Sequence, residues 1–360
     1  MAKRIGVVTG GGDCPGLNAV IRAIAKAAAQ RGWEALGILG GYEGLLEPRQ
    51  TLPLDYHALT GLLVRGGTIL GTANRGRFSA KVGHGETRKL PAELMEDTKR
   101  GMQALGLSAL ISIGGDGSLS IAQQMHEYGL PIVGVPKTID NDLEGTMWTF
   151  GFDSAVACAT DALDRLHTTA ESHNRVMVLE VMGRYAGWIA LYAGVAGGTD
   201  VILIPEIPFS YESVCSKIEA REALGRKFTL ITVAEGAREK GAEFVTSAGH
   251  EANREAHLGG IGAVVAAEVR KRSGKETRTC VLGHLQRGGT PTTFDRALCS
   301  MFGAVAVELV DAGNFGKMVA FTGQQVGAVD ISQAVGRLKT VPSNGGLVRT
   351  ARALGICLGD

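Results

Sequence analysis

Short, continuous apolar runs alternate with amphipathic segments along most of the chain, and this alternation constrains the fold more than any other feature. A continuous apolar run indicates a strand that is buried on both faces, as in a parallel sheet covered by helices. The strand-like runs are RIGVVTG (residues 4–10), ALGIL (35–39), ALISIGG (109–115), LPIVGVP (130–136), VMVLEVMG (176–183), VILIPE (201–206), FTLITVAEG (228–236), TRTCVLGH (277–284) and KMVAFTG (317–323). The pattern predicts an α/β fold of doubly wound domains with mainly parallel sheets.

Helix-like segments with apolar residues at helical spacing separate these runs. The clearest are residues 18–32, 91–106 and 154–172. Pro91 opens the second of them, and proline is favoured in the first turn of a helix, so we expect the helix to begin there.

A chain of 360 residues is long enough for two domains. No Pro/Ser-rich linker marks a boundary, so we expect the chain to cross between domains more than once. We expect residues 1–151 with about 285–336 to form a larger domain. About residues 152–284 with 337–360 would form a smaller domain.

Composition excludes several classes of protein. The 37 basic and 36 acidic residues nearly cancel, which argues against a general nucleic-acid or membrane surface. The six cysteines are scattered without a CxxC pair, which indicates free thiols in a reducing compartment. The N-terminal apolar run ends in glycines after a few residues and is typical of a first strand, so we expect a cytoplasmic protein.

Polar and glycine-rich loops follow the apolar runs. The carboxyl ends of parallel strands are where ligands bind in open α/β sheets. The loops are TGGGDCPGLN (residues 9–18), SIGGDGSLS (112–120), PKTIDND (136–142), MGRYAG (182–187), AEG (234–236) and GHLQRGG (283–289). We therefore expect the functional residues in these loops.

The first loop, residues 9–18, joins a strand to a helix. Its glycines let backbone N–H groups face an anion, and the helix N-terminus adds partial positive charge. A phosphate site is one interpretation and a tight strand-to-helix turn is the other, because the spacing fits neither the dinucleotide fingerprint nor the P-loop.

The loop GGDGS repeats this design and adds Asp116. A carboxylate at this place either caps the following helix, in competition with Ser118, or binds a hard cation that bridges phosphates. Mg²⁺ accepts one or two carboxylates together with phosphate oxygens, which favours the second interpretation.

The stretch KTIDND crowds charge at the end of an apolar run. Thr138, Asp140 and Asp142 alternate, so an extended segment would point them to one side. We expect Asp140 to act as general base on an attacking hydroxyl and Asp142 to support the metal. Lys137 and Thr138 would contact the transferring phosphoryl group. The alternative is a solvated acidic turn.

Arginines occur at both ends of the later strands. Arg184 follows a buried strand, where a guanidinium can stabilise a transferring phosphoryl group. Arg175 and Arg278 stand at strand beginnings, so they bind ligand only if it belongs to a neighbouring subunit; otherwise they are surface charges. His284 and Arg287 lie at a strand's end.

Five motifs, in the order GGDCPGLNAVIR, GGDGS, TIDND, EVMGRYAGW and VLGHLQRGG, resemble the phosphofructokinase A family of 6-phosphofructokinases over about residues 4–316. The resemblance implies a homo-oligomer, a tetramer rather than a dimer, of two-domain subunits. The larger domain would bind the donor nucleotide and the smaller domain the sugar phosphate. It implies transfer of a phosphoryl group from ATP to the 1-hydroxyl of fructose 6-phosphate with Mg²⁺.

The resemblance also implies roles for particular residues. Asp140 would be the base, Thr138 and Arg184 would stabilise the transition state, and Asp116 would serve Mg²⁺. The nucleotide would contact Gly12, Tyr42, Arg75, Gly115, Asp116, Gly117 and Ser118, although Arg77 is an alternative to Arg75. The sugar phosphate would contact Thr138, Asp140, Met182, Gly183, Arg184, Glu235, His284 and Arg287, with Arg175 and Arg278 from the adjacent subunit.

The phosphoryl donor tracks two positions in this family. ATP users commonly carry glycine at both, whereas pyrophosphate users carry an acidic residue and a lysine. This chain combines Gly117 with Lys137. An aspartate at position 117 would repel a nucleotide's α-phosphate, so Gly117 favours a nucleotide, ATP before ADP, with pyrophosphate as the alternative.

An effector pocket is a further implication of the resemblance. Arg22, Lys26, Arg226 and Lys227 match the family's basic pattern. Tyr56 and His167 replace arginines, and Asp200 replaces a glutamate, so the effector is left open. The tail after Lys339 has no assigned role.

Other classes fit less well. A NAD kinase or a lipid kinase shares the GGDG loop but lacks TIDND, and a silent nucleotide-sensing subunit would be expected to lose Asp140 or Arg184. A dinucleotide-dependent dehydrogenase needs an acidic ribose-binding residue after the second strand, which GILGGYEG lacks.

Overall fold

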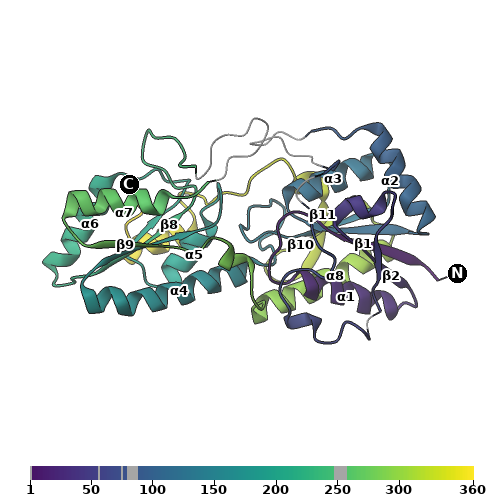
Figure 1. Ribbon diagram of the computed structural model, residues 1–360, viewed down its shortest axis with the longest axis horizontal. Helices are drawn as coiled ribbons and strands as arrows, with labels where there is room; N and C mark the ends of the chain where they lie inside the picture. Colours follow the sequence, from purple (N-terminus) through teal and green to yellow (C-terminus); the bar gives the residue numbers. More distant parts are fainter. Residues whose placement is uncertain (1, 56, 74–75, 79–87, 247–257) are drawn as a thin grey trace. The chain divides into compact units, whose positions relative to one another are not determined.

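The computed structural model describes residues 2–55, 57–73, 76–78, 88–246 and 258–360, which form two compact units (Figure 1). Unit 1 comprises Met1–Ile139, Leu143–Ser154 and Arg287–Leu338, and unit 2 comprises Asp140–Asp142, Ala155–Gln286 and Lys339–Asp360. The predicted larger domain ran unbroken from residue 1 to residue 151, whereas residues 140–142 group with unit 2. The assignment of one unit to the donor and the other to the sugar phosphate stays a prediction.

Unit 1 is built on a sheet whose described strands follow the order β11-β10-β5-β4-β1-β2-β3. The strands are β1 (Arg4–Thr9), β2 (Glu34–Ile38), β3 (Thr51–Pro53), β4 (Ala109–Gly114), β5 (Ile132–Pro136), β10 (Lys317–Phe321) and β11 (Val326–Asp330). All neighbours are parallel except the pairs β2–β3 and β10–β11 at the two edges. The chain leaves β1 for β2 on one side and later places β4 on the other, so the order reverses between β1 and β4, a place where open sheets bind ligands.

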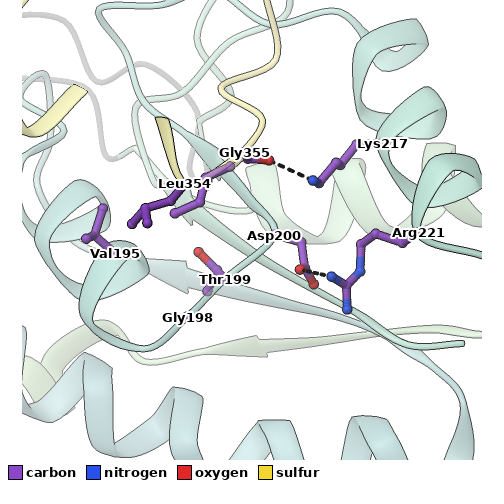
Figure 2. A pocket seen from close by; sticks show the side chains of 9 residues that line it. Val195, Gly198, Thr199, Asp200, Lys217, Arg221, Leu354 and Gly355 are labelled. Carbon is purple, nitrogen blue, oxygen red and sulfur yellow. Dashed lines mark hydrogen bonds and ion pairs between the residues drawn. The ribbon is translucent and has the colours of Figure 1, made fainter. Parts of the chain in front are cut away.

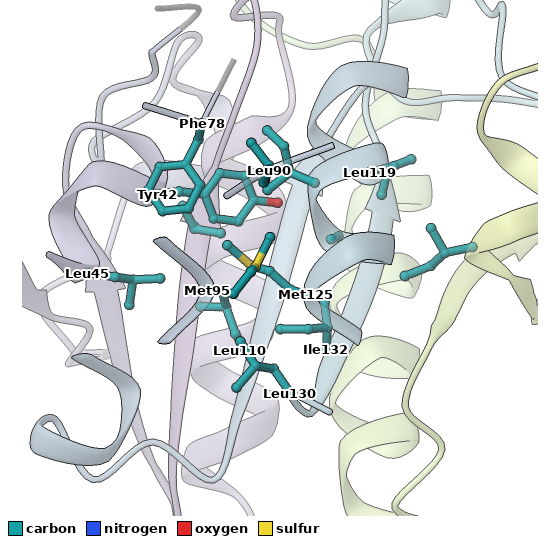
Figure 3. Close-up of a cluster of buried hydrophobic side chains, with 14 of the residues drawn as sticks. Tyr42, Leu45, Phe78, Leu90, Met95, Leu110, Leu119, Met125, Leu130 and Ile132 are labelled. Carbon is teal, nitrogen blue, oxygen red and sulfur yellow. The ribbon is translucent and has the colours of Figure 1, made fainter. Parts of the chain in front are cut away.

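Helices cover both faces of this sheet. They are α1 (Leu17–Ala29), α2 (Ala92–Ala104), α3 (Asp116–Glu127), α8 (Thr293–Asp311) and the short α9 (Ile331–Ala334), with 3-10 helices η1 (Gly41–Leu45) and η2 (Leu62–Val64). Helices α1 and α8 pack on one face, and α2 and α3 on the other (Figure 1). One buried cluster, which includes Tyr42, Leu110 and Met125, fills the space between sheet and helices (Figure 3).

Unit 2 is built on a parallel sheet of order β7-β8-β6-β9. Its strands are β6 (Val176–Val181), β7 (Val201–Leu203), β8 (Thr229–Ala234) and β9 (Thr277–Val281). The helices are α4 (Phe152–His173), whose first turn belongs to unit 1, α5 (Trp188–Ala196), α6 (Tyr211–Ala223), α7 (Ile261–Ser273) and α10 (Gly346–Ala353), with the 3-10 helix η3 (Gly283–Arg287) after β9. Helices α4 and α5 lie on one face of the sheet and α6 and α7 on the other (Figure 1).

The predicted fold class is confirmed: both sheets are mainly parallel and both have helices on two faces. The prediction for Pro91 is wrong, because α2 begins at Ala92 and Pro91 is its N-cap, with an extended ψ of 141°. A cap residue keeps non-helical dihedrals while its carbonyl already accepts the first helical hydrogen bond, here from Met95 N at 3.2 Å. In the part of the chain that the structure describes, no helix is both long and apolar enough to cross a membrane.

Candidate functional site

Three loops meet at the carboxyl ends of β1, β4 and β5, which are neighbours in the unit 1 sheet. We call residues 10–16, after β1, the glycine loop. Gly16 ends it with φ 109° at the N-cap of α1, and a Cβ there would lie 2.7 Å from Cys299 Sγ. Only glycine combines this backbone conformation with so close an approach, which explains its place in the strand-to-helix turn.

Two cations hold the backbone carbonyls of the glycine loop. Lys137 Nζ donates to Gly12 O at 2.5 Å, and Arg287 Nη1 donates to Asp13 O at 3.2 Å. Lys137 is only 3% exposed, so its charge is concentrated in a poorly hydrated place. A Cβ at Gly12 would lie 2.8 Å from Arg287 Nη1, so this glycine permits the guanidinium to approach. The cluster suits a phosphate-rich ligand by charge.

The second loop places the N-terminus of α3 beside the glycine loop. Gly115 is the N-cap and Asp116 the first helical residue, so Asp116 does not occupy the N-cap position. Asp116 Oδ1 accepts a hydrogen bond from Gly336 N at 3.1 Å. A helix start with backbone N–H groups and one carboxylate suits a phosphate that carries a hard cation.

Tyr42 supports the start of α3 through a hydrogen bond. Its hydroxyl donates to Ser118 O at 2.9 Å and lies 2.5 Å from Ser112 Oγ. Tyr42 is buried in the hydrophobic cluster of unit 1, and burial raises the pKa of its hydroxyl (Figure 3). The structure thus shows Tyr42 as a support for the α3 N-terminus, and its direct contact with a nucleotide stays a prediction.

The third loop begins with Lys137 and Thr138. Lys137 N donates to Gly114 O at 2.9 Å, and Thr138 O accepts from Thr149 Oγ1 at 2.7 Å. An ideal Cβ at Gly115 would lie 3.2 Å from Lys137 O, so the second and third loops pack backbone to backbone. Gly12, Gly115, Asp116, Ser118 and Lys137 are thus brought together in unit 1, as predicted for a donor site.

The predicted one-sided alternation of Thr138, Asp140 and Asp142 is wrong. A turn occupies Ile139 and Asp140, and Asn141 has φ 51°, in the left-handed region. In an extended strand, side chains two residues apart point to the same face, and a left-handed residue breaks this alternation. Asparagine tolerates this region better than most residues. We call residues 140–142 the aspartate loop; it belongs to unit 2.

Asp140 lies close to Glu235, which follows β8. Asp140 is 5% exposed, and its charge is one cause of the raised pKa of Glu235. Burial is the larger cause, and together they raise the pKa of Glu235 to about 7. Two carboxyl groups in one poorly hydrated place disfavour double ionisation, as at sites that bind hydroxyls or transfer protons.

Arg184 lies in the loop after β6, the strand next to β8. It adopts φ 49°, and its backbone N donates to Glu235 Oε1 at 3.0 Å. Preceding it, Gly183 has φ 142° and Met182 N donates to Gln286 Oε1 at 2.8 Å. Asp140, Met182, Gly183, Arg184 and Glu235 therefore all lie in unit 2, and their part in phosphoryl transfer stays a prediction.

His284 and Arg287 lie in η3, directly after β9. His284 is exposed in unit 2, whereas Arg287 belongs to unit 1 and contacts the glycine loop. Gln286, between them, is fully buried and was not predicted from the sequence. Gln286 and Met182 are 104 positions apart in the sequence, so no local motif predicts their contact.

Arg175 directly precedes β6, and Arg278 is the second residue of β9. Both therefore stand at strand beginnings, as the sequence indicated. Both guanidiniums contact one carboxylate of the same chain: Glu276 lies 2.9 Å from Arg175 Nη2 and 2.5 Å from Arg278 Nη2. The side chains of Arg278 and Glu276 are 50% and 43% exposed, so this ion pair is weak and exchangeable. Their reach to a neighbouring subunit stays a prediction.

The residues predicted for an effector pocket are distributed over both units. Arg22 and Lys26 lie on α1 in unit 1, and the exposed Arg226 and Lys227 lie between α6 and β8 in unit 2. That they share a pocket stays a prediction.

Asp200 has a partner within its own unit. It forms an ion pair with Arg221 and accepts from Leu230 N at 2.9 Å, while burial raises the pKa of its carboxyl. A pocket of about 220 Å³ adjoins this pair; Lys217, which also lines it, donates to Gly355 O at 2.6 Å (Figure 2).

Arg75 and Tyr56 lie outside the described residues. Arg77 is described, and its guanidinium and backbone N both contact Glu43, at 2.8 and 2.6 Å. All six cysteines are free thiols, and burial raises the pKa of Cys14, within the glycine loop, to about 12. The raised pKa disfavours the thiolate, which is the nucleophilic form, at neutral pH.

Comparison with known proteins identifies similar chains. The family described as Phosphofructokinase matches residues 4–310. The chain is 52% identical over 358 residues to the ATP-dependent 6-phosphofructokinase of Chloroflexus aggregans, covering 99% of this chain and 98% of that one. It is 49% identical over 346 residues to the pyrophosphate–fructose 6-phosphate 1-phosphotransferase of Streptomyces coelicolor, covering 94% and 96%.

A solved structure shares the fold. The phosphofructokinase of Pichia pastoris in the T-state superimposes with a TM-score of 0.81 at 29% identity. The match covers 99% of this chain and 37% of the Pichia chain.

Proposed function

The chain belongs to the phosphofructokinase family, and we propose that it transfers the γ-phosphoryl group of ATP to the 1-hydroxyl of fructose 6-phosphate in glycolysis. The observation that carries the proposal is the cluster of Asp140, Arg184 and Glu235 in unit 2. A buried carboxylate, an arginine loop and a carboxyl with a pKa of about 7 are the groups that a hydroxyl acceptor and a transferring phosphoryl group require.

The reaction that these residues support is an in-line displacement. Asp140 accepts the proton of the 1-hydroxyl as its oxygen bonds to the γ-phosphorus, while the bond from that phosphorus to the β,γ-bridging oxygen breaks and ADP leaves. Arg184 and Thr138 stabilise the charge on the transferring group, and the neighbouring Lys137 adds a positive charge. Asp142 would support Mg²⁺.

Different residues bind the two substrates. The glycine loop, the α3 N-terminus with Gly117, and a donor-side arginine at Arg75 bind the nucleotide. Met182, Gly183, Glu235, His284 and Arg287 bind the sugar phosphate, joined by Arg175 and Arg278 from a neighbouring subunit of a homotetramer. Free thiols fit a cytoplasmic enzyme.

Asp116 would hold Mg²⁺ together with the donor phosphates. One carboxylate at a helix start fits this ion, which usually keeps several waters and takes the rest of its ligands from phosphate. When bound, Mg²⁺ neutralises charge on the donor phosphates. Among the described residues no group of three or more His, Cys, Asp or Glu could hold a metal ion.

Pyrophosphate is the second candidate donor. Lys137 favours pyrophosphate, because the family's pyrophosphate users carry lysine at the corresponding position. The pyrophosphate–fructose 6-phosphate 1-phosphotransferase of Streptomyces coelicolor is 49% identical to this chain. Gly117 favours ATP, because no carboxylate opposes the α-phosphate of a nucleotide at this position.

A donor panel decides between them. Purified protein is given fructose 6-phosphate and Mg²⁺ with ATP, ADP, GTP or pyrophosphate, and formation of fructose 1,6-bisphosphate is followed. The proposal expects the highest kcat/KM with ATP. A higher kcat/KM with pyrophosphate overturns the choice of donor, and no product with any donor overturns the proposed reaction.

A further inference from the structure

The segment at residues 339–341 is bound to the aspartate loop, although nearly 200 residues separate them in sequence. Lys339 N donates to Asp142 O at 2.9 Å, and Lys339 Nζ donates to Asn141 Oδ1 at 2.9 Å. The contact therefore holds both the backbone and a side chain of the loop. We call residues 339–341 the strap.

The strap fixes a backbone conformation that is unfavourable for most residues. Asn141 has φ 51°, and a non-glycine residue in this region persists where its surroundings hold it. Asn141 is 4% exposed, so its amide oxygen needs a protein partner, and the ammonium of Lys339 provides one. The direction in which Asp140 and Asp142 leave the loop depends on this single left-handed residue.

A second set of contacts joins the strap to the loop that carries Arg184. Trp188 Nε1 donates to Lys339 O at 2.8 Å, and Lys339 Nζ lies 5.9 Å from the centre of the Trp188 ring. A cation over an indole face at this distance is attracted by the ring. Trp188 is the first residue of α5, which begins four residues after Arg184.

Glu206 makes the same connection through its carboxylate. It accepts from Val341 N at 2.7 Å and from Gly187 N at 3.0 Å. Burial raises the pKa of Glu206, against the effect of these backbone hydrogen bonds. Lys339, at one end of the strap, thus contacts both the aspartate loop and Trp188. Val341, at the other end, is linked through Glu206 to Gly187, the N-cap of α5.

We propose that Lys339 is a positioning residue for phosphoryl transfer, which holds the aspartate loop in register with the Arg184 loop through Asn141 and Trp188. The inference rests on the proposed function and gives the C-terminal tail a role in it. The kcat of an enzyme falls when a reacting group is displaced by about 1 Å, even where the contacts with the substrates persist. Lys339 then acts on kcat and not on substrate affinity.

The test uses the purified protein of residues 1–360. Lys339→Met removes the ammonium but keeps the stem over Trp188, Lys339→Arg restores a cation, and Lys99→Met on the exposed face of α2 is the matched control. We expect Lys339→Met to lower kcat about 10- to 100-fold with KM for both substrates changed less than about threefold. Lys339→Arg recovers most of kcat, and Lys99→Met changes neither constant.

A double-mutant cycle tests whether Lys339 acts through Asn141. Asn141→Ala alone lowers kcat, and the combination with Lys339→Met lowers it no further than the larger single loss. Losses that multiply, or an unchanged kcat in Lys339→Met, overturn the proposal. So does a loss of activity that matches the loss of folded protein in a thermal unfolding curve.

Hydrogen exchange gives a readout that does not depend on activity. Amides of a peptide spanning residues 138–143 exchange faster in Lys339→Met than in wild type and in Lys99→Met. Equal exchange in all three proteins overturns the role of Lys339 in holding the loop. If the wild type transfers no phosphoryl group, the proposed function fails, whereas the exchange comparison still decides whether the strap holds the aspartate loop.

Discussion

The backbone N of Arg184 donates a hydrogen bond to Oε1 of Glu235 at 3.0 Å, and this bond joins the loops after two neighbouring strands, β6 and β8. The carboxyl group that accepts it is mostly buried beside Asp140, so its pKa is raised to about 7. Both the geometry and the protonation of this side of the site depend on Glu235.

Glu235 makes the stability of the unliganded protein depend on pH. Its pKa is about 7 in the folded chain, against an ordinary value of 4.5, so between these pH values the folded state holds a proton that the unfolded chain has released. The free energy of unfolding therefore falls as pH rises through this window. Glu235→Gln remains neutral, and we expect it to gain up to about 3 kcal/mol relative to wild type between pH 5 and pH 8.

Urea unfolding at the two pH values measures this effect. Glu219→Gln on the exposed face of α6 is the control and should follow the wild type at both. A constant difference between Glu235→Gln and wild type at pH 5 and pH 8 would show that Glu235 does not titrate in this window.

Gly236 leaves no room for a side chain beside the Arg184 loop. An ideal Cβ on Gly236 would lie 1.8 Å from Arg184 O, a backbone atom, so the loop itself must move. We expect Gly236→Ala to reduce kcat at least about tenfold and to destabilise the fold by about 1–3 kcal/mol. Gly346→Ala is the control in the same unit, because nothing lies within 4 Å of its Cβ. Steady-state kinetics and urea unfolding check both variants, and wild-type kcat in Gly236→Ala would mean that the position of Arg184 matters little.

The strands show how much of the fold can be predicted from the sequence. Strands such as β1 and β6 are buried and continuously apolar, so their positions and their parallel pairing could be predicted. Strands β3 and β11 are partly exposed, TLP is only three residues long and VGAVD carries only small apolar residues, so the sequence analysis did not predict them. Edge strands gain their pairing from a neighbour and not from their own composition.

The site divides in the same way. Glycines and charged residues in one loop could be read as a phosphate site, because the helix start and the loop are adjacent in sequence. The left-handed turn at Asn141 and the contacts of Gln286 and Lys339 could not be predicted, because each depends on a partner more than a hundred residues away. Spacing within a motif gives side-chain directions only where the backbone is regular.

Asp140 is the residue whose loss should affect chemistry most. Asp140→Ser is expected to lower kcat by about 10²–10⁴ while donor binding stays close to wild type, as for removal of a general base. The same variant should lower the pKa of Glu235, because the charge of Asp140 is one of its causes. Turnover assays, calorimetric titration with ATP and an NMR titration of Glu235 give the three readouts. Asp164→Ser on the exposed face of α4 is the control, and near-normal turnover in Asp140→Ser would remove it from the role of base.

Arg278 should act in a neighbouring subunit's site. Arg278→Ala and Asp140→Ser are each expected to be nearly inactive, but subunits of the two variants, mixed and reassembled, form sites in which Asp140 and Arg278 are both intact. Random pairing at equal amounts restores about a quarter of wild-type activity. A mixture of Asp140→Ser with Arg184→Ala is the control and restores none, because both residues belong to one chain's site. Absence of restoration in the first mixture would assign Arg278 to its own subunit or to the surface pair with Glu276.

Gly117 is the residue that we expect to decide the phosphoryl donor. It is the second residue of α3, directly after Asp116, and a carboxylate there would face the α-phosphate of a nucleotide in a poorly screened place. We expect Gly117→Asp to raise KM for ATP at least about 100-fold, with KM for fructose 6-phosphate within about threefold of wild type. Gly117→Asn adds nearly the same volume without charge and separates the two causes: a small effect in Gly117→Asn assigns the loss to repulsion, and an equal effect assigns it to size. Steady-state kinetics with ATP and with pyrophosphate measure both variants, and an unchanged KM for ATP in Gly117→Asp would place the nucleotide away from the start of α3.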